Sequence, residues 1–323
     1  MGLRLGLLST ASINRKILAA ARASDAVDVV AVASRDPDRA AAYAREHGIE
    51  RPFGSYEELL ADPGVDAVYI SLPNSLHVDW SVRALEAGKH VLCEKPLARA
   101  AADVERAFDV AEASGRVLAE AFMYRHHPQT QLVAALVAEG AIGELRALRA
   151  SFSFPLTDAE NVRLRPELDG GSLMDVGCYC VSGMRLHAGE PERMGAEQVL
   201  SPSGVDLSFA ATMRFPRDVL GLFHSSMALP RRQGLELLGS EATLLVEAPW
   251  RVDFGGDVLL LRDGGAERVP VPEADAYLAE LEDFAAAVAG DREPLLGRAD
   301  AVGQARALEA LYAAAERGQE VSP

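Results

Sequence analysis

The first third of the chain alternates short apolar segments, rich in β-branched residues, with segments of helical periodicity. Apolar strands that alternate with helices form parallel sheets covered on both faces. We expect strands over 3–9, 27–34, 65–72, 90–94 and 116–122, and helices over 14–23, 36–48, 55–62, 75–88 and 98–115. Asp36, Pro37 and Gly48 stand where an N-cap, a first-turn proline and a C-cap belong. The pattern therefore predicts a doubly wound parallel sheet.

The pattern changes after about residue 123. A helix over 128–139 and a strand over 144–154 lead into an irregular segment, 155–171, and a helix that begins near Ser172. Strands at hairpin-like spacing are expected over 208–215, 220–229, 234–240, 242–248, 258–263 and 267–272, and helices over 276–289 and 299–316. This half predicts a second domain around a largely antiparallel sheet.

Length and charge limit the classes of partner. A chain of 323 residues exceeds the usual size of one domain, so two are expected. The net charge of −16, with no basic patch, argues against nucleic acid or an anionic membrane as partner. The amino terminus lacks a signal-peptide layout and no uncharged apolar stretch approaches about 18 residues, so a cytoplasmic location is expected. Three cysteines fit free thiols in a reducing compartment.

The turn after the first strand reads GLLSTASIN, residues 6–14. A dinucleotide fingerprint has three glycines here, and this turn has only Gly6, with small residues at Ser9 and at Ala11 or Ser12. Small residues still let a backbone approach a pyrophosphate, and Ser9 and Thr10 add hydroxyl donors. An ordinary strand-to-helix turn explains this stretch equally well.

The end of the second strand favours NADP over NAD. Ser34 and Arg35 occupy the place where NAD-binding domains carry an acidic residue for the ribose, and Arg39 follows one helical turn later. A hydroxyl and guanidinium groups suit a 2′-phosphate. Asp36 is expected to cap the helix, although use of both NADP and NAD stays open.

Two further segments follow parallel strands, at the edge where open α/β sheets bind ligands. The first, SLPNSLH, offers Leu72, Pro73, Asn74 and His77, and the second, LCEKPLA, offers Glu94 and Lys95. The chain has three lysines against 29 arginines, so a retained lysine hints at a group that must be able to lose its proton. A surface ion pair between Lys95 and Glu94 is the alternative.

Taken together in this order, GLLSTASIN, ASRDPDRA, SLPNSLH, CEKP and GGSLMDVGCYC resemble the Gfo/Idh/MocA oxidoreductases over nearly the whole chain. The resemblance implies an NADP-binding Rossmann domain over 1–122. It also implies a substrate-binding and dimerisation domain over 123–323, with an open, mostly antiparallel sheet through which homodimers or homotetramers form. It places Lys95, Asp175 and Tyr179 at the catalytic site. Tyrosine in place of the family's frequent histidine matches the sugar and dihydrodiol dehydrogenase branch.

These residue types suit alcohol oxidation, which needs hydride transfer to the nicotinamide and a base for the hydroxyl proton. We assign Tyr179 as general acid/base, because a neighbouring ammonium such as Lys95 lowers a tyrosine pKa from its usual value of about 10. Asp175 would orient the substrate or the tyrosine, and the roles of Lys95 and Tyr179 are exchangeable. Tyr124, His126 and Arg163 are candidates for substrate binding, with ordinary surface-loop positions as the alternative.

The stretch GGSLMDVGCYC also contains two cysteines. If Ser172 caps a helix, Asp175 completes a capping box and shares a face with Tyr179, while Leu173, Val176, Cys180 and Met184 form a buried stripe. Cys178 and Cys180 would then point about 200° apart, which excludes a shared metal or a disulfide between them. His126 and His127 lack further ligands at suitable spacing, so no metal site is predicted.

The resulting hypothesis is an NADP-dependent sugar or cyclic polyol dehydrogenase, with an aldose 1-dehydrogenase as the first candidate. A trans-dihydrodiol dehydrogenase and a keto-sugar reductase are alternatives within the same chemistry. A lyase or glycosidase that recycles a tightly bound cofactor and a non-catalytic NADP-binding regulator are more distant ones, and retention of Lys95 and Tyr179 argues against the regulator.

Overall fold

The computed structural model describes residues 2–323, which form two compact units. Of the described residues, the first unit comprises 2–98, 102–126 and 275–302, and the second comprises 99–101, 127–274 and 303–323. The sequence predicted a single boundary at residue 122, and the structure differs because the helix over 276–289 packs against elements of the first unit.

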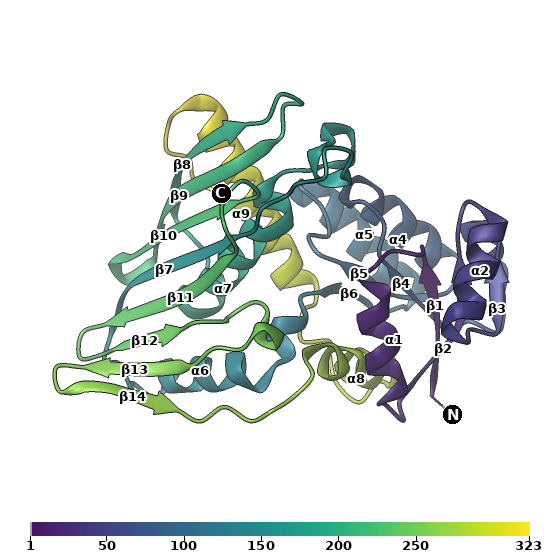
Figure 1. The fold of residues 1–323 in the computed structure, drawn as a ribbon, viewed down its shortest axis with the longest axis horizontal. Coiled ribbons are helices and arrows are strands. Elements are labelled where there is room, and N and C mark those ends of the chain that lie inside the picture. The colour runs from purple at the N-terminus through teal and green to yellow at the C-terminus, as the bar shows by residue number, and fades with distance from the viewer. Residues whose placement is uncertain (1) are drawn as a thin grey trace. The chain divides into compact units, whose positions relative to one another are not determined.

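Within the described residues, the first unit contains a six-stranded parallel sheet in the order β3-β2-β1-β4-β5-β6 (Figure 1). This order is that of a Rossmann fold, so the predicted doubly wound sheet is confirmed. The strands are β1 (Leu3–Leu8), β2 (Val27–Ala33), β3 (Arg51–Phe53), β4 (Ala67–Ile70), β5 (His90–Glu94) and β6 (Leu118–Ala121). The short edge strand β3 was not predicted.

The helices of the first unit are α1 (Asn14–Arg22), α2 (Pro37–His47), α3 (Tyr56–Ala61), α4 (His77–Glu86), α5 (Ala101–Ser114) and α8 (Ala276–Ala289), with 3₁₀ turns η1 (Asn74–Leu76) and η2 (Met123–His126). The predicted caps of α2 are confirmed. The Asp36 carboxylate accepts hydrogen bonds from the amides of Asp38 and Arg39, and Gly48 ends the helix with a φ of 72°.

The second unit is built on an eight-stranded sheet in the order β14-β13-β12-β11-β7-β10-β9-β8, in which only the β7–β10 pair is parallel among the described strands. This confirms the mostly antiparallel sheet. The strands are β7 (Leu145–Ser153), β8 (Arg193–Leu200), β9 (Asp206–Phe215), β10 (Val219–Ser226), β11 (Arg232–Gly239), β12 (Thr243–Val246), β13 (Val258–Arg262) and β14 (Gly265–Val269).

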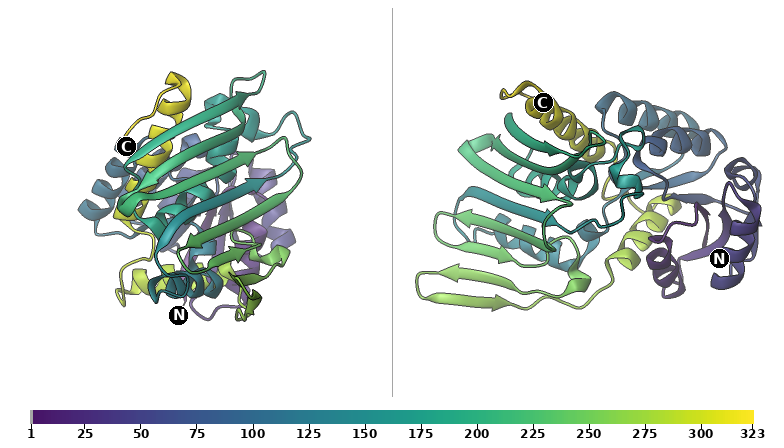
Figure 2. Two further views of the ribbon diagram at one scale, coloured as in Figure 1. Left: turned by 90° about the vertical axis from the view of Figure 1, so that its left-hand side faces the viewer. Right: turned by 45° about the horizontal axis from the view of Figure 1, so that its top comes forward.

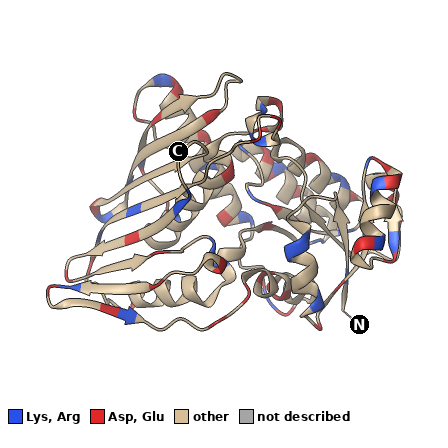
Figure 3. Ribbon diagram, in the orientation of Figure 1, with Lys and Arg blue, Asp and Glu red and all other residues tan. Residues whose placement is uncertain are grey.

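One face of this sheet packs against the helices α6 (Pro128–Ala138), α7 (Cys178–Ala188) and α9 (Arg298–Arg317), and the other face turns to the viewer in the left panel of Figure 2. Short helical turns η3 (Val162–Leu164), η4 (Pro166–Leu168), η6 (Pro216–Asp218) and η7 (Val252–Phe254) lie in the loops, and η5 (Leu173–Gly177) immediately precedes α7. Basic and acidic residues alternate along α2 and the β13–β14 hairpin (Figure 3), as expected for a solvated surface.

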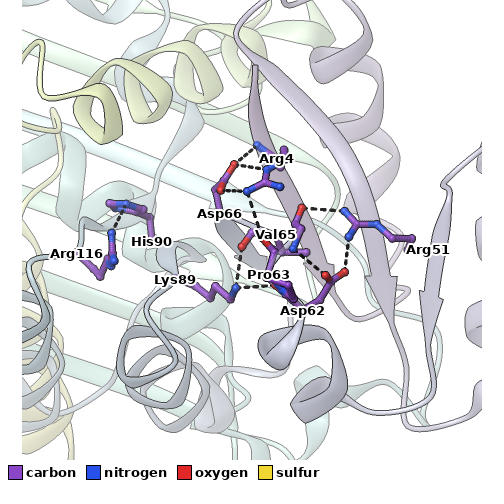
Figure 4. A network of polar contacts seen from close by, with 10 residues as sticks. Arg4, Arg51, Asp62, Pro63, Val65, Asp66, Lys89, His90 and Arg116 are labelled. Carbon is purple, nitrogen blue, oxygen red and sulfur yellow. Dashed lines mark hydrogen bonds and ion pairs between the residues drawn. The ribbon is translucent and has the colours of Figure 1, made fainter. Parts of the chain in front are cut away.

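A polar network joins the amino-terminal ends of β1, β4 and β5 (Figure 4). Arg4 donates from Nε to Asp66 Oδ2 at 2.8 Å, and Arg51 pairs with Asp62. Ligands of open α/β sheets bind at the opposite, carboxyl edge. We therefore assign this network to stability rather than to chemistry.

Lys89 is the buried cation of this network. Its side chain is 7 % exposed, and Nζ donates to the carbonyl oxygens of Asp62 at 2.7 Å and Val65 at 2.8 Å. We expect Lys89→Met to lower the free energy of unfolding by about 2 kcal/mol, because two carbonyls lose a charged donor. The exposed Lys16→Met is the control and should change it by less than about 0.5 kcal/mol. Urea unfolding measures both, and equal effects would contradict the assignment.

Candidate active site

The turn between β1 and α1 has a backbone conformation that normally belongs to glycine. Ser9 has a φ of 133°, a region that non-glycine residues rarely adopt. Side chains hold it there: Ser9 Oγ lies 2.8 Å from Ser71 Oγ, and Asn14 Nδ2 donates to the Ser9 carbonyl at 2.8 Å. The turn therefore has the shape of a dinucleotide fingerprint without its second glycine, and it presents Thr10 and Ala11 half-buried at the start of α1.

Gly6 has a packing role beneath this turn. A Cβ at this position would lie 2.8 Å from Leu59 Cδ2 and 3.2 Å from Val65 Cγ1. The glycine thus lets β1 pack closely against α3, and direct contact with a cofactor stays a prediction.

The residues predicted to bind a 2′-phosphate lie around the end of β2. Ser34 is buried, its Oγ accepts a hydrogen bond from the Asp36 amide at 3.2 Å, and Arg35 is exposed. Burial raises the pKa of Tyr56, while a hydrogen bond to Arg35 and the charges of Arg35 and Arg39 lower it. Both guanidinium groups are therefore close to Tyr56, beside the end of the strand.

The backbone around Lys95 is held by hydrogen bonds to the carboxylates of the half-buried Glu94 and the buried Glu120. The Glu94 carboxylate accepts from the Lys95 amide at 3.2 Å and from the Tyr69 hydroxyl, and the Leu97 amide donates to Glu120 Oε1 at 2.7 Å. The Lys95–Pro96 peptide bond is cis. The hydrogen bonds of Glu94 and Glu120 give the support that a reactive side chain needs to keep one position.

His77 also supports this loop. Its Nδ1 lies 2.9 Å from the Pro96 carbonyl and its Nε2 lies 2.8 Å from the Leu72 carbonyl, and the side chain is 1 % exposed. Burial lowers the pKa of His77. The sequence predicted direct cofactor contact for His77, whereas in the structure both of its ring nitrogens face main-chain carbonyls. It connects the loop after β4, where Pro73 and Asn74 are half-buried, to the loop after β5.

In the second unit, two of the predicted substrate residues form an ion pair. Arg163 Nε donates to Asp175 Oδ2 at 2.6 Å, with the Arg163 side chain 41 % exposed and that of Asp175 14 % exposed. The Arg163 guanidinium also lies 5.9 Å from the centre of the Phe154 ring. The irregular segment after β7 thus brings a cation to the helix that carries Asp175 and Tyr179.

Tyr179 is packed among aromatic side chains that the sequence analysis did not identify. The Phe152 ring meets it edge-on at 5.5 Å, and the Trp250 ring lies 6.3 Å away. Trp250 is fully buried and its indole Nε1 donates to the Ser151 carbonyl at 2.9 Å. Phe152 lies at a position where the inward alternation of β7 could have signalled it, whereas Trp250 follows β12 in an irregular segment and carries no local signal.

The helix that begins this motif differs from the prediction. Residues Leu173–Gly177 form a π-helical turn before α7, and Ser172 has helical backbone angles with no capping hydrogen bond from its side chain. The predicted capping box is wrong, because the Asp175 side chain pairs with Arg163 instead. Single π-turns inserted into helices occur frequently at functional sites. The structure shows no disulfide among the described residues, and Cys93, Cys178 and Cys180 are buried free thiols.

Tyr124 and His126 lie in η2 of the first unit, and both are buried. His126 Nδ1 lies 3.8 Å from Asp283 Oδ2, and burial lowers the pKa of His126 to about 4. No group of histidine, cysteine or carboxylate side chains over residues 2–323 is arranged to hold a metal ion. A direct role of Tyr124 or His126 in substrate binding stays a prediction.

The lowered pKa of His126 predicts a pH effect on stability. An unfolded histidine titrates near 6.5, so the unfolded state takes up a proton first as the pH falls, and stability is lost between pH 6.5 and about 4. The loss reaches at most about 3 kcal/mol. We expect His126→Asn to remove this contribution, so that the difference in unfolding free energy between variant and wild type changes with pH over this range. A constant difference would contradict the prediction.

Comparison with known proteins agrees with this architecture. Residues 4–122 match the family described as "Oxidoreductase family, NAD-binding Rossmann fold", and residues 130–245 match the "GFO/IDH/MocA C-terminal domain". A D-xylose 1-dehydrogenase (NADP(+)) of Haloferax volcanii is 39% identical over 320 residues, 98% of each chain. A dTDP-3,4-didehydro-2,6-dideoxy-alpha-D-glucose 3-reductase of Streptomyces violaceoruber is 39% identical over 88% of this chain and 85% of its own length.

Solved structures are also similar. A 3-ketoreductase from Actinomadura kijaniata in complex with NADP and TDP-benzene is 33% identical, with a TM-score of 0.92 over 97% of this chain and 98% of that chain. An aldose-aldose oxidoreductase from Caulobacter crescentus is 27% identical, with a TM-score of 0.93 over 100% of both chains. The fold and the two matched domains define an oxidoreductase built on a nicotinamide-nucleotide-binding domain. The chain belongs to the Gfo/Idh/MocA family of oxidoreductases.

Proposed function

We propose that this protein is an NADP-dependent oxidoreductase that transfers hydride between the nicotinamide and a carbinol carbon of a sugar or cyclic polyol, with an aldose oxidised at C1 as the first candidate substrate. The observation that carries this proposal is the presence of both Lys95 and Tyr179, at the spacing of two residues of a related ketoreductase. The Actinomadura ketoreductase was also solved with a tyrosine replaced by phenylalanine and with a lysine replaced by alanine, and the two sites are separated by the same number of residues as Lys95 and Tyr179. The xylose dehydrogenase similarity supports the substrate class.

In the proposed reaction, NADP supplies the hydride acceptor. Tyr179 would act as a phenolate, which the Lys95 ammonium would stabilise. This phenolate would take the proton from the substrate hydroxyl as the carbonyl forms, and would become the neutral phenol. The alternative assignment exchanges these two roles. Asp175, held by Arg163 at 2.6 Å, orients the substrate, and the buried rings of Phe152 and Trp250 keep water away from the Tyr179 ring.

The residues around the end of β2 fit NADP. A hydroxyl from Ser34 and guanidinium groups from Arg35 and Arg39 supply the hydrogen-bond donors that a 2′-phosphate requires. The positive φ of Ser9 gives the β1–α1 turn a shape that suits a pyrophosphate. An acidic side chain at this place would serve the ribose hydroxyls of NAD, but the Asp36 carboxylate caps α2 instead, which favours NADP; use of NAD as a second cofactor stays open.

We expect Arg35→Ala to raise the KM for NADP⁺ about tenfold or more, because a charge-assisted contact to the phosphate is lost. The KM for NAD⁺ should change less than about threefold, since NAD⁺ lacks that phosphate. Arg45→Ala, which replaces an exposed arginine near the far end of α2, is the control and should affect neither value. Steady-state kinetics with both cofactors measures the difference, and equal losses for NADP⁺ and NAD⁺ would contradict the phosphate assignment.

A substrate panel tests the function itself. Purified protein is mixed with NADP⁺ and aldoses, inositols or trans-dihydrodiols, and with NADPH and keto-sugars, while absorbance of the reduced cofactor is followed. Reduction of NADP⁺ with an aldose is the expected result. The alternative is a lyase or glycosidase that recycles its cofactor. Three results together would indicate it: no change of absorbance with any substrate in either direction, nicotinamide that co-purifies with the protein, and product that forms without net reduction.

A keto-sugar reductase is the second candidate. The Streptomyces and Actinomadura relatives are named reductases of a dTDP-linked keto-sugar, and they cover most of this chain. The same residues serve this direction, with Tyr179 donating the proton to the carbonyl oxygen. Turnover of a nucleotide-linked keto-sugar with NADPH, at a kcat/KM above that for free aldoses, would favour it over the first candidate.

A trans-dihydrodiol dehydrogenase is a further candidate. A trans-1,2-dihydrobenzene-1,2-diol dehydrogenase of Xenopus tropicalis is 36% identical over 67% of this chain, and the same substrate panel tests this activity.

We further propose that the exposed face of the eight-stranded sheet mediates self-association. Leu220 and Leu222 are 50 % and 46 % exposed on β10, and Arg149 and Glu236 form an ion pair 3.6 Å apart on the same face. A shallow hollow of about 710 Å³ between these strands has room for side chains of a second copy. Light scattering after Leu222→Arg should show a smaller species than wild type.

No described helix is long and apolar enough to cross a membrane. The buried free thiols suit the cytoplasm, which we propose as the location.

A further inference from the structure

Asp206, the first residue of β9, is a buried carboxylate that neither the sequence analysis nor the proposed reaction uses. Its side chain is 2 % exposed and accepts three hydrogen bonds. The donors are the Ser172 hydroxyl at 2.8 Å and the Leu173 amide at 2.7 Å, both on Oδ2, and the Tyr312 hydroxyl at 2.9 Å on Oδ1. Burying a charge is costly unless it is paired, so a carboxylate with this donor set is a built feature.

The contact with Leu173 caps the helix that carries the catalytic candidates. Leu173 begins the π-turn that continues into α7, and the first amides of a helix have no partner within it. A carboxylate there satisfies an amide and interacts favourably with the helix dipole. The sequence assigned this capping function to Ser172, whereas the structure places it on a side chain from β9.

Glycines allow the helix start to approach the sheet this closely. Gly171 has a φ of 121°, and a Cβ at this position would lie 2.1 Å from Asp206 Oδ1. A Cβ at Gly177 would lie 2.8 Å from Ser225 Oγ on β10. The glycines at both ends of the π-turn therefore keep Asp175 and the start of α7 against β9 and β10.

Tyr312 extends the arrangement to the segment that follows Lys95. The Tyr312 ring lies on α9, and the Arg99 guanidinium is 3.7 Å from its centre. Arg99 also pairs with Glu316 at 3.2 Å, one turn further along α9. Arg99 is four residues after Lys95 in the chain. Arg99, Tyr312, Asp206 and Leu173 thus form a continuous series of contacts, which starts just after Lys95 and ends at the helix of Tyr179.

We propose that Asp206, with Tyr312 as its partner, is a positioning residue that fixes the π-turn and so places Asp175 and Tyr179 for proton transfer. The inference rests on the proposed function, because it concerns the same reaction. Proton transfer depends steeply on geometry, and a displacement of about 1 Å can lower the rate about a hundredfold. Asp206 acts through the helix and contacts no reacting atom in this mechanism.

The test combines kinetics with hydrogen exchange. Asp206→Asn preserves size but loses the charge, and its amide group faces the Tyr312 hydroxyl as a second donor. We expect kcat to fall about tenfold or more, the KM for NADP⁺ to stay within about twofold, and the amides of residues 173–179 to exchange at least about tenfold faster. Tyr312→Phe removes only the hydroxyl, keeps the ring beneath Arg99, and provides a milder second variant in case Asp206→Asn does not fold.

Glu190→Gln is the matched control. Glu190 holds Arg185 at the other end of α7 through contacts of 2.7 and 2.9 Å, so its loss weakens the same helix without touching Asp206. We expect it to leave kcat within about twofold. A general structural effect would lower kcat equally in Glu190→Gln and Asp206→Asn at matched stability, and this outcome would overturn the proposal.

The remaining outcomes distinguish a failure of the positioning role of Asp206 from a failure of the proposed function. Unchanged exchange over residues 173–179 in Asp206→Asn and Tyr312→Phe would overturn the positioning role. Faster exchange with unchanged kcat would show that the helix start is irrelevant to the reaction, which also overturns the proposal while leaving the proposed function intact. Absence of turnover by the wild-type protein with every substrate would overturn the proposed function instead, and the exchange result would still decide whether Asp206 fixes the helix.

Discussion

Tyr179→Phe should lower kcat for aldose oxidation at least about a hundredfold, the scale expected when an acid/base group is removed. The Phe ring keeps the packing between Phe152 and Trp250 but has no phenolate oxygen to accept the substrate proton. Lys95→Ala should cause a loss of similar size, because a tyrosine without a neighbouring ammonium keeps a pKa of about 10 and is a poor base near neutral pH. The Kd for NADP⁺ should stay within about threefold in both variants. NADPH absorbance and cofactor titration measure these quantities.

The controls replace the same residue types elsewhere. Tyr43→Phe on α2 and the exposed Lys16→Ala on α1 should retain near-normal turnover. If Lys95 and Tyr179 act as a unit, the double variant should lose little more activity than the more impaired single variant. Near-normal kcat in both single variants would remove the proposed mechanism. A large loss in Lys95→Ala alone would indicate that lysine is the immediate proton acceptor.

The fold was predictable because its signals are local. The parallel sheet follows from apolar segments that alternate with helical periodicity, and the caps of α2 follow from Asp36, Pro37 and Gly48, which act within a few residues of their partners. The edge strand β3 has three residues and lies partly exposed, so its sequence has too short an apolar run to stand out. The contacts of α8 with α1, β2 and η2 depend on tertiary packing, which explains why the boundary at residue 122 did not describe the compact units.

The candidate site residues remain a prediction, and the contacts that the structure shows around them were only partly predictable. Arg163 pairs with Asp175 across 12 residues of the chain. This ion pair engages the Asp175 side chain, which the local spacing had assigned to a capping box. The π-turn has no simple sequence signature, and its cap comes from Asp206, 33 residues away from Leu173. His77 has the residue type of a ligand-binding side chain, but burial and two carbonyl contacts identify it as a support of the loop. Local patterns therefore predicted the candidate motif, and the tertiary contacts show which residues hold its backbone in place.

Gly171→Ala should lower the free energy of unfolding by about 4 kcal/mol. Part of the cost is the backbone, because a φ of 121° is rarely adopted by residues with a Cβ and costs about 1–3 kcal/mol. The other part is steric: the new Cβ would lie 2.1 Å from Asp206 Oδ1 and 3.2 Å from the Tyr312 hydroxyl, and overpacking of a buried site costs about 1–3 kcal/mol. The Asp206 carboxylate cannot move away without losing a hydrogen bond from Tyr312, Ser172 or the Leu173 amide.

Gly189→Ala separates the two costs. Gly189 ends α7 with a φ of 87°, and an added Cβ there would meet nothing within 4 Å, so only the backbone cost of about 2 kcal/mol applies. Urea unfolding of both variants should show a larger loss for Gly171→Ala, with similar m-values. Combining Gly171→Ala with Asp206→Ala should recover part of the steric cost, because the carboxylate is no longer in the way. Equal losses for the two glycine variants would mean that Gly171 serves only backbone conformation, and the close packing of the helix start on Asp206 would then contribute nothing measurable to stability.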